Sequence, residues 1–227
     1  MTDEYVYPDK FKVVLGGIVG SQAQGFATKA SDTDRGFVFV APTLDLLGLT
    51  PPEPSVQLHD PDMWGHEIGK FIRLALTCNP TILELLWVDH EVCSSYAGRM
   101  LVMHRAQFLS AHVLYGAYKG YAKQQIVRAE AEHRTVKARR HCLRLLLQGA
   151  QALRDGYVTV KPSSMWVTNI RTASETSERF IELYTHLAED LDDAYASTKL
   201  PAEPDREMGE FVLRQIRKHV IDRETAQ

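Results

Sequence analysis

The residues best suited to chemistry lie between two apolar runs near the start of the chain. Gly20-Ser21 follows Val13–Val19, and Asp32 and Asp34 precede Phe37–Val40. In an extended segment, side chains two residues apart point to the same face, so we expect Asp32 and Asp34 to lie side by side. Paired carboxylates favour a hard cation such as Mg²⁺, or Mn²⁺ in its place. A glycine loop with free backbone N–H groups beside such an ion is suited to phosphate binding.

Three other motifs built from similar residues are excluded. An EF-hand loop that starts at Asp32 requires glycine and glutamate where the chain has Phe37 and Thr43. A P-loop requires lysine after its second glycine, and Phe26 follows Gly25. The dinucleotide pattern Gly-x-Gly-x-x-Gly is absent from this stretch. The motif is therefore not a generic phosphate loop.

The composition is that of an ordinary globular protein. Of 227 residues, 44% are hydrophobic and 24% charged, and the formal net charge is −3, so any anion site must be a local patch. The chain has three cysteines, Cys78, Cys93 and Cys142. Their odd number and wide spacing favour a reducing compartment over a disulfide framework. The N-terminus is acidic and has no apolar h-region, so we expect no signal peptide, and no apolar run reaches transmembrane length. We expect a cytoplasmic protein with no membrane partner.

The elements that must position these residues are strands in the first half of the chain. We predict strands over Phe11–Val19 and Arg35–Val40 and a third strand over either Ser55–His59 or Asp62–His66. A helix from Glu67 to Cys78 follows, and Thr81 is expected to cap a short helix that ends at Trp87.

The second half of the chain reads as helical. The expected helices are Met100–Ala131 with a break near Gly116 or Gly120, Thr135–Leu153, Glu175–Tyr195 and Asp205–Val220. We therefore predict an α+β fold with a small mixed sheet flanked by helices. The expected domains are a catalytic core at residues 1–98 and a helical domain at residues 99–227.

The motifs together resemble those of a known enzyme superfamily. Gly20-Ser21 with Ser31-Asp32-Thr33-Asp34 is similar to the signature of the DNA polymerase β-type nucleotidyltransferases. Within it, the chain resembles a bacterial and phage branch associated with RNA repair. Segments 65–71 and 79–87 resemble that branch's third-acid strand and helix, and segments 120–124 and 137–144 resemble its helical half. The resemblance implies a mixed sheet with helices, an NTP donor such as ATP and metal-dependent nucleotidyl transfer.

The resemblance also implies roles for individual residues. Asp32 and Asp34 would bridge the metal ions, and Glu67 would be the third carboxylate ligand, with Asp60 and Asp62 as alternatives. A different reading of Glu67 is a charge that the helix dipole favours at a helix N-terminus. The backbone N–H of Gly20 and the hydroxyl of Ser21 would contact phosphate. Ser31 would steady the acidic turn beside the nucleotide, or its side chain would form a local cap on the backbone.

A basic stripe in the helical half is a second candidate for phosphate binding. Lys137, His141 and Arg144 are spaced i, i+4 and i+7, so they share a helix face, to which Arg140 adds. This face suits triphosphate or nucleic-acid phosphate, or it is a solvated basic surface.

The predicted function is transfer of a nucleoside monophosphate from an NTP to an acceptor hydroxyl. The acceptor is left open among an RNA or tRNA end, a protein and a small molecule, and the sequence does not indicate the oligomeric state. The alternative is a catalytically silent module on the same fold that binds nucleotide or nucleic acid.

Overall fold

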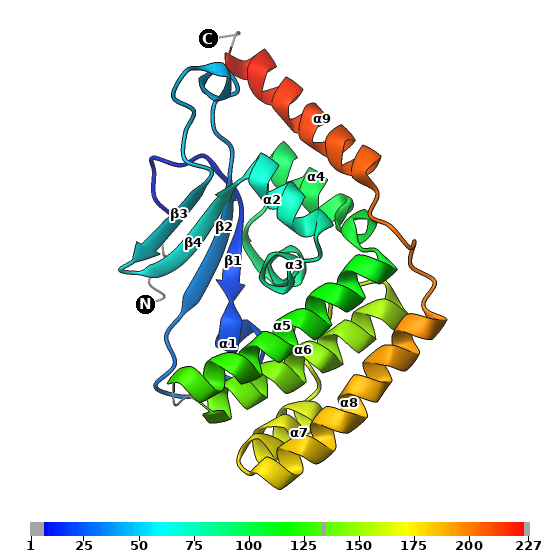
Figure 1. Cartoon of the computed structure of the whole chain (residues 1–227). Coiled ribbons are helices and arrows are strands. Elements are labelled where there is room, and N and C mark those ends of the chain that lie inside the picture. The colour runs from blue at the N-terminus through cyan, green and yellow to red at the C-terminus, as the bar shows by residue number, and fades with distance from the viewer. Residues whose placement is uncertain (1–6, 133–134, 225–227) are drawn as a thin grey trace.

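The computed structural model describes residues 7–132 and 135–224, in which a mixed sheet packs against helices (Figure 1). Its strands are β1 Val13–Val19, β2 Asp34–Phe39, β3 Ser55–His59, β4 Asp62–Glu67 and β5 His90–Val92. Their order across the sheet is β3-β4-β2-β1-β5. β2 and β4 are parallel, and the other neighbouring strands are antiparallel. The predicted α+β fold with a small mixed sheet is confirmed.

Alternation along the strands separates two apolar clusters. Val38 of β2 belongs to the main core under the helices, whereas Phe37 and Phe39 point to the opposite face. On that face they contact Met63 and are covered by Tyr7 from the segment before β1. Even-numbered residues of β2 and β4 therefore face the helices, and the functional residues of these strands follow the same alternation.

Nine helices and two short 3-10 turns complete the part of the chain that the structure describes. The bundle α5–α8 lies below the sheet, and α9 returns to pack on α2 and α4 (Figure 1). The bounds are α1 Gly20–Ala23, α2 Ile68–Leu76, α3 Pro80–Trp87, α4 Tyr96–Met103, α5 Ala111–Glu132, α6 Thr135–Asp155, α7 Ser164–Ser174, α8 Ser177–Ser197 and α9 Arg206–Glu224, with η1 Asp45–Leu47 and η2 Arg105–Phe108.

Several predicted boundaries are corrected by the structure. Both proposed positions of the third strand are strands, β3 and β4. The predicted helix over 100–131 is interrupted at residues 104–110, where Phe108 is buried, and not at Gly116 or Gly120. α3 is capped by Asn79, whose side chain accepts hydrogen bonds from the backbone of Thr81 and Ile82.

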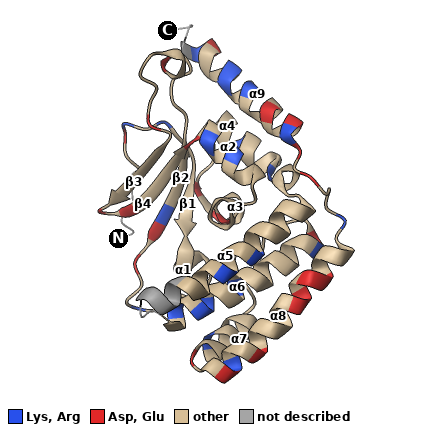
Figure 2. Cartoon of the chain, in the orientation of Figure 1, with Lys and Arg blue, Asp and Glu red and all other residues tan. Residues whose placement is uncertain are grey.

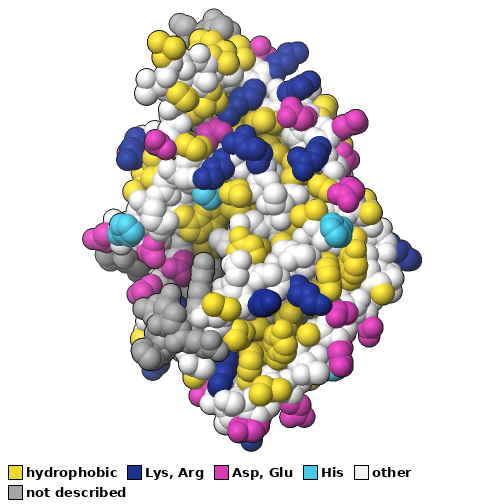
Figure 3. Space-filling model, in the orientation of Figure 1, with side chains coloured by type: hydrophobic (Ala, Val, Ile, Leu, Met, Phe, Trp, Pro, Cys, Tyr) yellow, Lys and Arg dark blue, Asp and Glu magenta, His cyan; other side chains and the backbone are white. Residues whose placement is uncertain are grey.

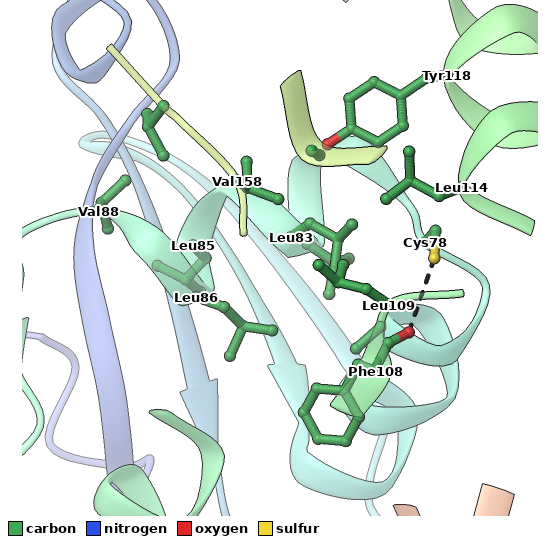
Figure 4. Close-up of a cluster of buried hydrophobic side chains, with 14 of the residues drawn as sticks. Cys78, Leu83, Leu85, Leu86, Val88, Phe108, Leu109, Leu114, Tyr118 and Val158 are labelled. Carbon is green, nitrogen blue, oxygen red and sulfur yellow. Dashed lines mark hydrogen bonds between the residues drawn. The ribbon is translucent and has the colours of Figure 1, made fainter. Parts of the chain in front are cut away.

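The short helix α3 lies at the centre of the hydrophobic core (Figure 4). Its Leu83 and Leu86 are fully buried, and Leu114 and Tyr118 of α5 belong to the same cluster. Burial of each such leucine contributes about 1.5–3 kcal/mol relative to exposure. The apolar core is thus continuous from the sheet to the helical bundle. The predicted division at residue 98, which lies within α4, stays a prediction.

The described residues contain no membrane-spanning helix and no disulfide bond. No described helix has the length and apolar character needed to cross a bilayer. Cys78, Cys93 and Cys142 are free thiols. The buried Cys78 donates to the Phe108 carbonyl oxygen at 3.7 Å (Figure 4).

Candidate active site

The glycine loop between β1 and β2 is held close to the first carboxylate of β2. Gly20 has φ 67°, in the left-handed region, and a Cβ there would lie 2.6 Å from Asp34 Oδ2. Backbone conformation and space therefore both require glycine. The side-chain Nε2 of Gln22 donates to Thr33 Oγ1 at 2.6 Å and to the Asp32 carbonyl oxygen at 3.3 Å. These hydrogen bonds close the loop beside the acidic residues.

Three carboxylates approach one another where β2 and β4 begin. The parallel register pairs Arg35 with Met63, so Asp34 and Asp62, each one residue earlier, are neighbours. Burial, followed by the charges of Asp62 and Asp32, raises the pKa of Asp34, while Lys137 opposes this shift. The described residues contain no ready cluster of three metal-ligating side chains. The three acids thus share a negative potential without forming a preassembled cage.

The structure separates Glu67 from Asp32 and Asp34. Glu67 ends β4, five residues after Asp62, and an odd separation places it on the opposite side of the strand. Its carboxylate accepts a 2.7 Å hydrogen bond from the Gly69 backbone N–H and pairs with Arg217 of α9. Glu67 is therefore the N-cap of α2, in agreement with its alternative reading, and the register brings Asp62 to Asp34 instead. Asp60, the other alternative, is exposed in the turn between β3 and β4.

The basic stripe of α6 faces the acidic end of the sheet across a cavity. The cavity measures about 690 Å³, and Lys and Arg residues gather at the start of α6 beside the beginning of β2 (Figure 2). Its lining includes Gly20, Ser21, Ser31, Asp32, Asp34, Asp62, Lys137, Arg140, His141 and Arg144. All of the predicted site residues except Glu67 thus meet around one cavity.

The members of the basic stripe differ in their surroundings. Lys137 is exposed, whereas Arg144 is buried and donates to Gln148 Oε1 at 3.0 Å. Burial, together with the charges of Arg144, Lys137 and Arg140, lowers the pKa of His141 to about 4. His141 is therefore neutral at pH 7 and adds no positive charge to the cavity wall.

Ser21 and Ser31 occupy different places in the loop. Ser21 lies in α1 and is half-buried at the cavity wall. Ser31 Oγ accepts a 2.9 Å hydrogen bond from the Thr28 backbone N–H. This contact is a local side-chain to backbone cap, the alternative expected for Ser31, and it stabilises the turn before Asp32.

Glu84 of α3 is a member of the site that the sequence analysis missed. Its carboxylate accepts hydrogen bonds from the Gly20 backbone N–H at 2.6 Å and from Gln24 Nε2 at 2.7 Å, and Arg144 lies 3.9 Å away. The expected phosphate donor at Gly20 is thus engaged by a protein carboxylate. Burial raises the pKa of Glu84, while Arg144 and these hydrogen bonds oppose the shift. Its one sequence signal is a charged residue inside the apolar run 82–86.

Comparison with known proteins gives one family match. The model of the RNA repair pathway DNA polymerase beta family, RlaP, matches residues 3–211. The match includes the glycine loop, all three aspartates and the basic face of α6. No curated protein matches the chain.

Proposed function

Because the chain belongs to the RNA repair pathway DNA polymerase beta family, we propose that it is a metal-dependent nucleotidyltransferase. It would move a nucleoside monophosphate from an NTP to an acceptor hydroxyl. In this reaction the acceptor oxygen bonds to the α-phosphorus, the bond to pyrophosphate breaks, and the hydroxyl proton passes to a nearby carboxylate or to water.

The observation that carries the proposal is that acidic and basic side chains line opposite walls of one cavity. Asp32, Asp34 and Asp62 lie on the sheet side, and Lys137 and Arg144 lie on α6. A volume of about 690 Å³ is within the range of small-molecule sites. Such a cavity suits a ligand that carries polyphosphate to the basic wall and a metal ion to the acidic wall.

The three aspartates fit a divalent metal by their chemistry. Burial, and then repulsion from Asp62 and Asp32, raises the pKa of Asp34, and a cation between the carboxylates would relieve that repulsion. All three would supply hard oxygen ligands, which suit Mg²⁺ or Mn²⁺. When bound, the metal would supply charge neutralisation at the reacting phosphate and activation of the attacking oxygen.

Other residues of the cavity would position the donor. Lys137 and Arg144 would neutralise phosphate oxygens, and the Ser21 hydroxyl would donate a hydrogen bond to them. The neutral imidazole of His141 would add a hydrogen bond without charge. Glu84 would act beneath the loop, as a positioning residue that holds Gly20 and Gln24.

The direct test is incubation with each α-labelled NTP, Mg²⁺ or Mn²⁺, and acceptors of several classes. Transfer of label that requires metal is expected, and Asp34→Ala should abolish it. Asp89→Ala, which removes an exposed carboxylate in the turn after α3, is the matched control and should keep the activity. Absence of both transfer and binding for all four nucleotides would reject the proposal.

The engagement of Gly20 by Glu84 favours testing a second function, a nucleotide-binding module without catalysis. Such a module would bind NTP, but the label would stay on the nucleotide with every acceptor and metal. Equilibrium binding measured beside the transfer assay separates the two functions.

A further inference from the structure

A line of side chains leads away from the acidic site along the helix-facing side of the sheet. Asp62, Trp64 and His66 alternate with residues of β4 that point to the opposite face of the sheet, and therefore share the helix-facing side. The indole of Trp64 lies over Gly36 of β2, where a Cβ would come within 2.5 Å of the ring. Two residues along a strand span about 6.6 Å, so Trp64 is one side chain away from the carboxylate pair.

A second cavity of about 310 Å³ opens over Trp64 and adjoins the first. The two share Gly20, Gln24, Asp34, Asp62, His141 and Arg144 in their lining. The wall beyond Asp62 is formed by Trp64 and Tyr121, with the amide side chains of Gln57 and Gln125. Aromatic faces and amide groups are the chemistry that receives a nucleobase, by stacking and by hydrogen bonds to its edge.

The same wall continues into a groove of about 500 Å³ that reaches His66 and Ser55. Trp64 and Tyr121 line both spaces. Asn79 Nδ2 donates to Tyr121 Oη at 2.8 Å, which fixes the ring at the junction. Trp64 and His66 have ring centroids 5.4 Å apart, so aromatic surface extends along the strand.

Basic side chains lie at the far end of this groove. Lys70 Nζ donates to Ser55 Oγ at 2.6 Å, which places its ammonium group at the groove wall. Arg73 and Arg217 both approach Gly69, and Lys and Arg side chains gather over α2 and α9 (Figure 3). Glu67 neutralises Arg217, whereas Lys70 and Arg73 have no carboxylate partner among the described residues. The groove thus ends on a surface of net positive charge.

We propose that this track, from Trp64 to Lys70 and Arg73, binds the 3′-terminal segment of a single-stranded nucleic acid as the acceptor. The proposal rests on the proposed function. The terminal hydroxyl lies at Asp34 and Asp62, the terminal base stacks on Trp64, and upstream phosphates lie toward Lys70 and Arg73. During transfer the 3′-oxygen bonds to the α-phosphorus, pyrophosphate leaves, and the hydroxyl proton passes to a carboxylate of the site.

The test measures binding of NTP and of a single-stranded oligonucleotide separately, with RNA and DNA versions of one sequence. The double variant Lys70→Gln/Arg73→Gln is compared with Arg179→Gln/Lys199→Gln, which removes the same charge from exposed positions on and after α8. We expect the first variant to weaken oligonucleotide binding about tenfold and to lower the slope of log K against log salt by about 1.4, for two lost phosphate contacts. NTP affinity and the control variant should stay unchanged.

Trp64→Ala should weaken oligonucleotide binding about five- to hundredfold, and Trp64→Phe should restore much of it, because a stacking face is retained. Equal oligonucleotide affinity in the two charge variants would overturn the proposal. So would NTP binding without any oligonucleotide binding, which would direct the search to protein or small-molecule acceptors and leave the proposed function intact. Absence of both NTP binding and transfer in the unmodified protein, with all four nucleotides, would reject the proposed function itself.

Discussion

The backbone N–H of Gly20 donates a 2.6 Å hydrogen bond to the Glu84 carboxylate, which joins the glycine loop to the central helix α3. Glu84 also accepts from Gln24 and lies 3.9 Å from Arg144 of α6. One buried carboxylate of α3 therefore contacts both the glycine loop and α6. Glu84 holds the glycine loop through these hydrogen bonds, and Ser21 of the same loop lines the cavity.

Glu84→Ala should strongly destabilise the protein, because it leaves buried donors without an acceptor. Loss of one partner of a buried pair costs about 3–5 kcal/mol. For a chain of this size that corresponds to a fall of roughly 6–20 °C in melting temperature, measured by circular dichroism. Glu84→Gln keeps an acceptor for Gly20 and should lose less. Glu182→Ala, at an exposed position on α8, is the control and should melt within about 2 °C of the parent. Equal melting of Glu84→Ala and this control would contradict the role of Glu84.

Asp62→Asn and Glu67→Gln should affect different properties. Asp62 is beside Asp34, so its loss should lower nucleotidyl transfer about a hundredfold or more, with little change in melting temperature. Glu67 pairs with Arg217 and caps α2, so Glu67→Gln should melt lower and keep transfer within a few-fold. Steady-state rates and melting curves for both variants decide the matter. A hundredfold loss of transfer in Glu67→Gln alone would restore Glu67 as the third carboxylate.

Asp62 and Glu67 show which features of the site local sequence patterns can predict and which they cannot. The sequence offers Asp62–His66 as one of two positions for a strand, and in the structure alternation along β4 puts Asp62, Trp64 and His66 on one face. Which end of that strand lies beside Asp34 depends on the parallel pairing of β2 with β4, a non-local contact that periodicity does not encode. The resemblance of the short segment 65–71 points to Glu67, but a short segment does not determine the register of the strand.

The basic stripe and Glu84 show the same limit in the helical half. The shared face of Lys137, His141 and Arg144 follows from helical spacing, and in the structure all three line one cavity. Spacing gives neither the packing that turns this face to the sheet nor the burial that makes His141 neutral. Glu84 was hidden because the sequence pattern of α3 is that of a buried helix, in which a single charge carries no sign of its partners.

Asp34→Asn should abolish transfer and slightly stabilise the fold. Burial and the neighbouring acids raise the pKa of Asp34, so the folded state binds this proton more tightly than the unfolded chain. Its contribution to stability is greatest below pH 3.8 and declines as the pH rises through the folded-state pKa. At pH 7 without divalent metal, removal of the charge should add on the order of 0.5 kcal/mol after solvent screening, or about 1–2 °C. The gain should vanish near pH 3. A lower melting temperature at pH 7 than that of the parent would contradict this account, and Asp89→Asn controls for the lost surface charge.

His141 should make the fold sensitive to acid between about pH 6.5 and pH 4. Its pKa is lowered to about 4 in the folded state by burial and then by Arg144, Lys137 and Arg140, whereas the unfolded side chain titrates near 6.5. As the pH falls through this window the unfolded chain binds a proton that the folded protein does not, so stability is lost. The difference amounts to up to about 3 kcal/mol. Denaturant unfolding at steps between pH 7.5 and pH 4 measures it.

The variant His141→Gln should lose this part of the pH dependence, while His186→Gln, at an exposed position on α8, should keep it. A histidine-selective NMR titration, with the His141 signals assigned by their absence in His141→Gln, should give a midpoint near 4. Tripolyphosphate bound in the cavity would place negative charge beside the imidazole and should move that midpoint upward. A midpoint at or above 6.5 in the free protein, or one that anion binding leaves unchanged, would mean that His141 does not face the phosphate site as a neutral group.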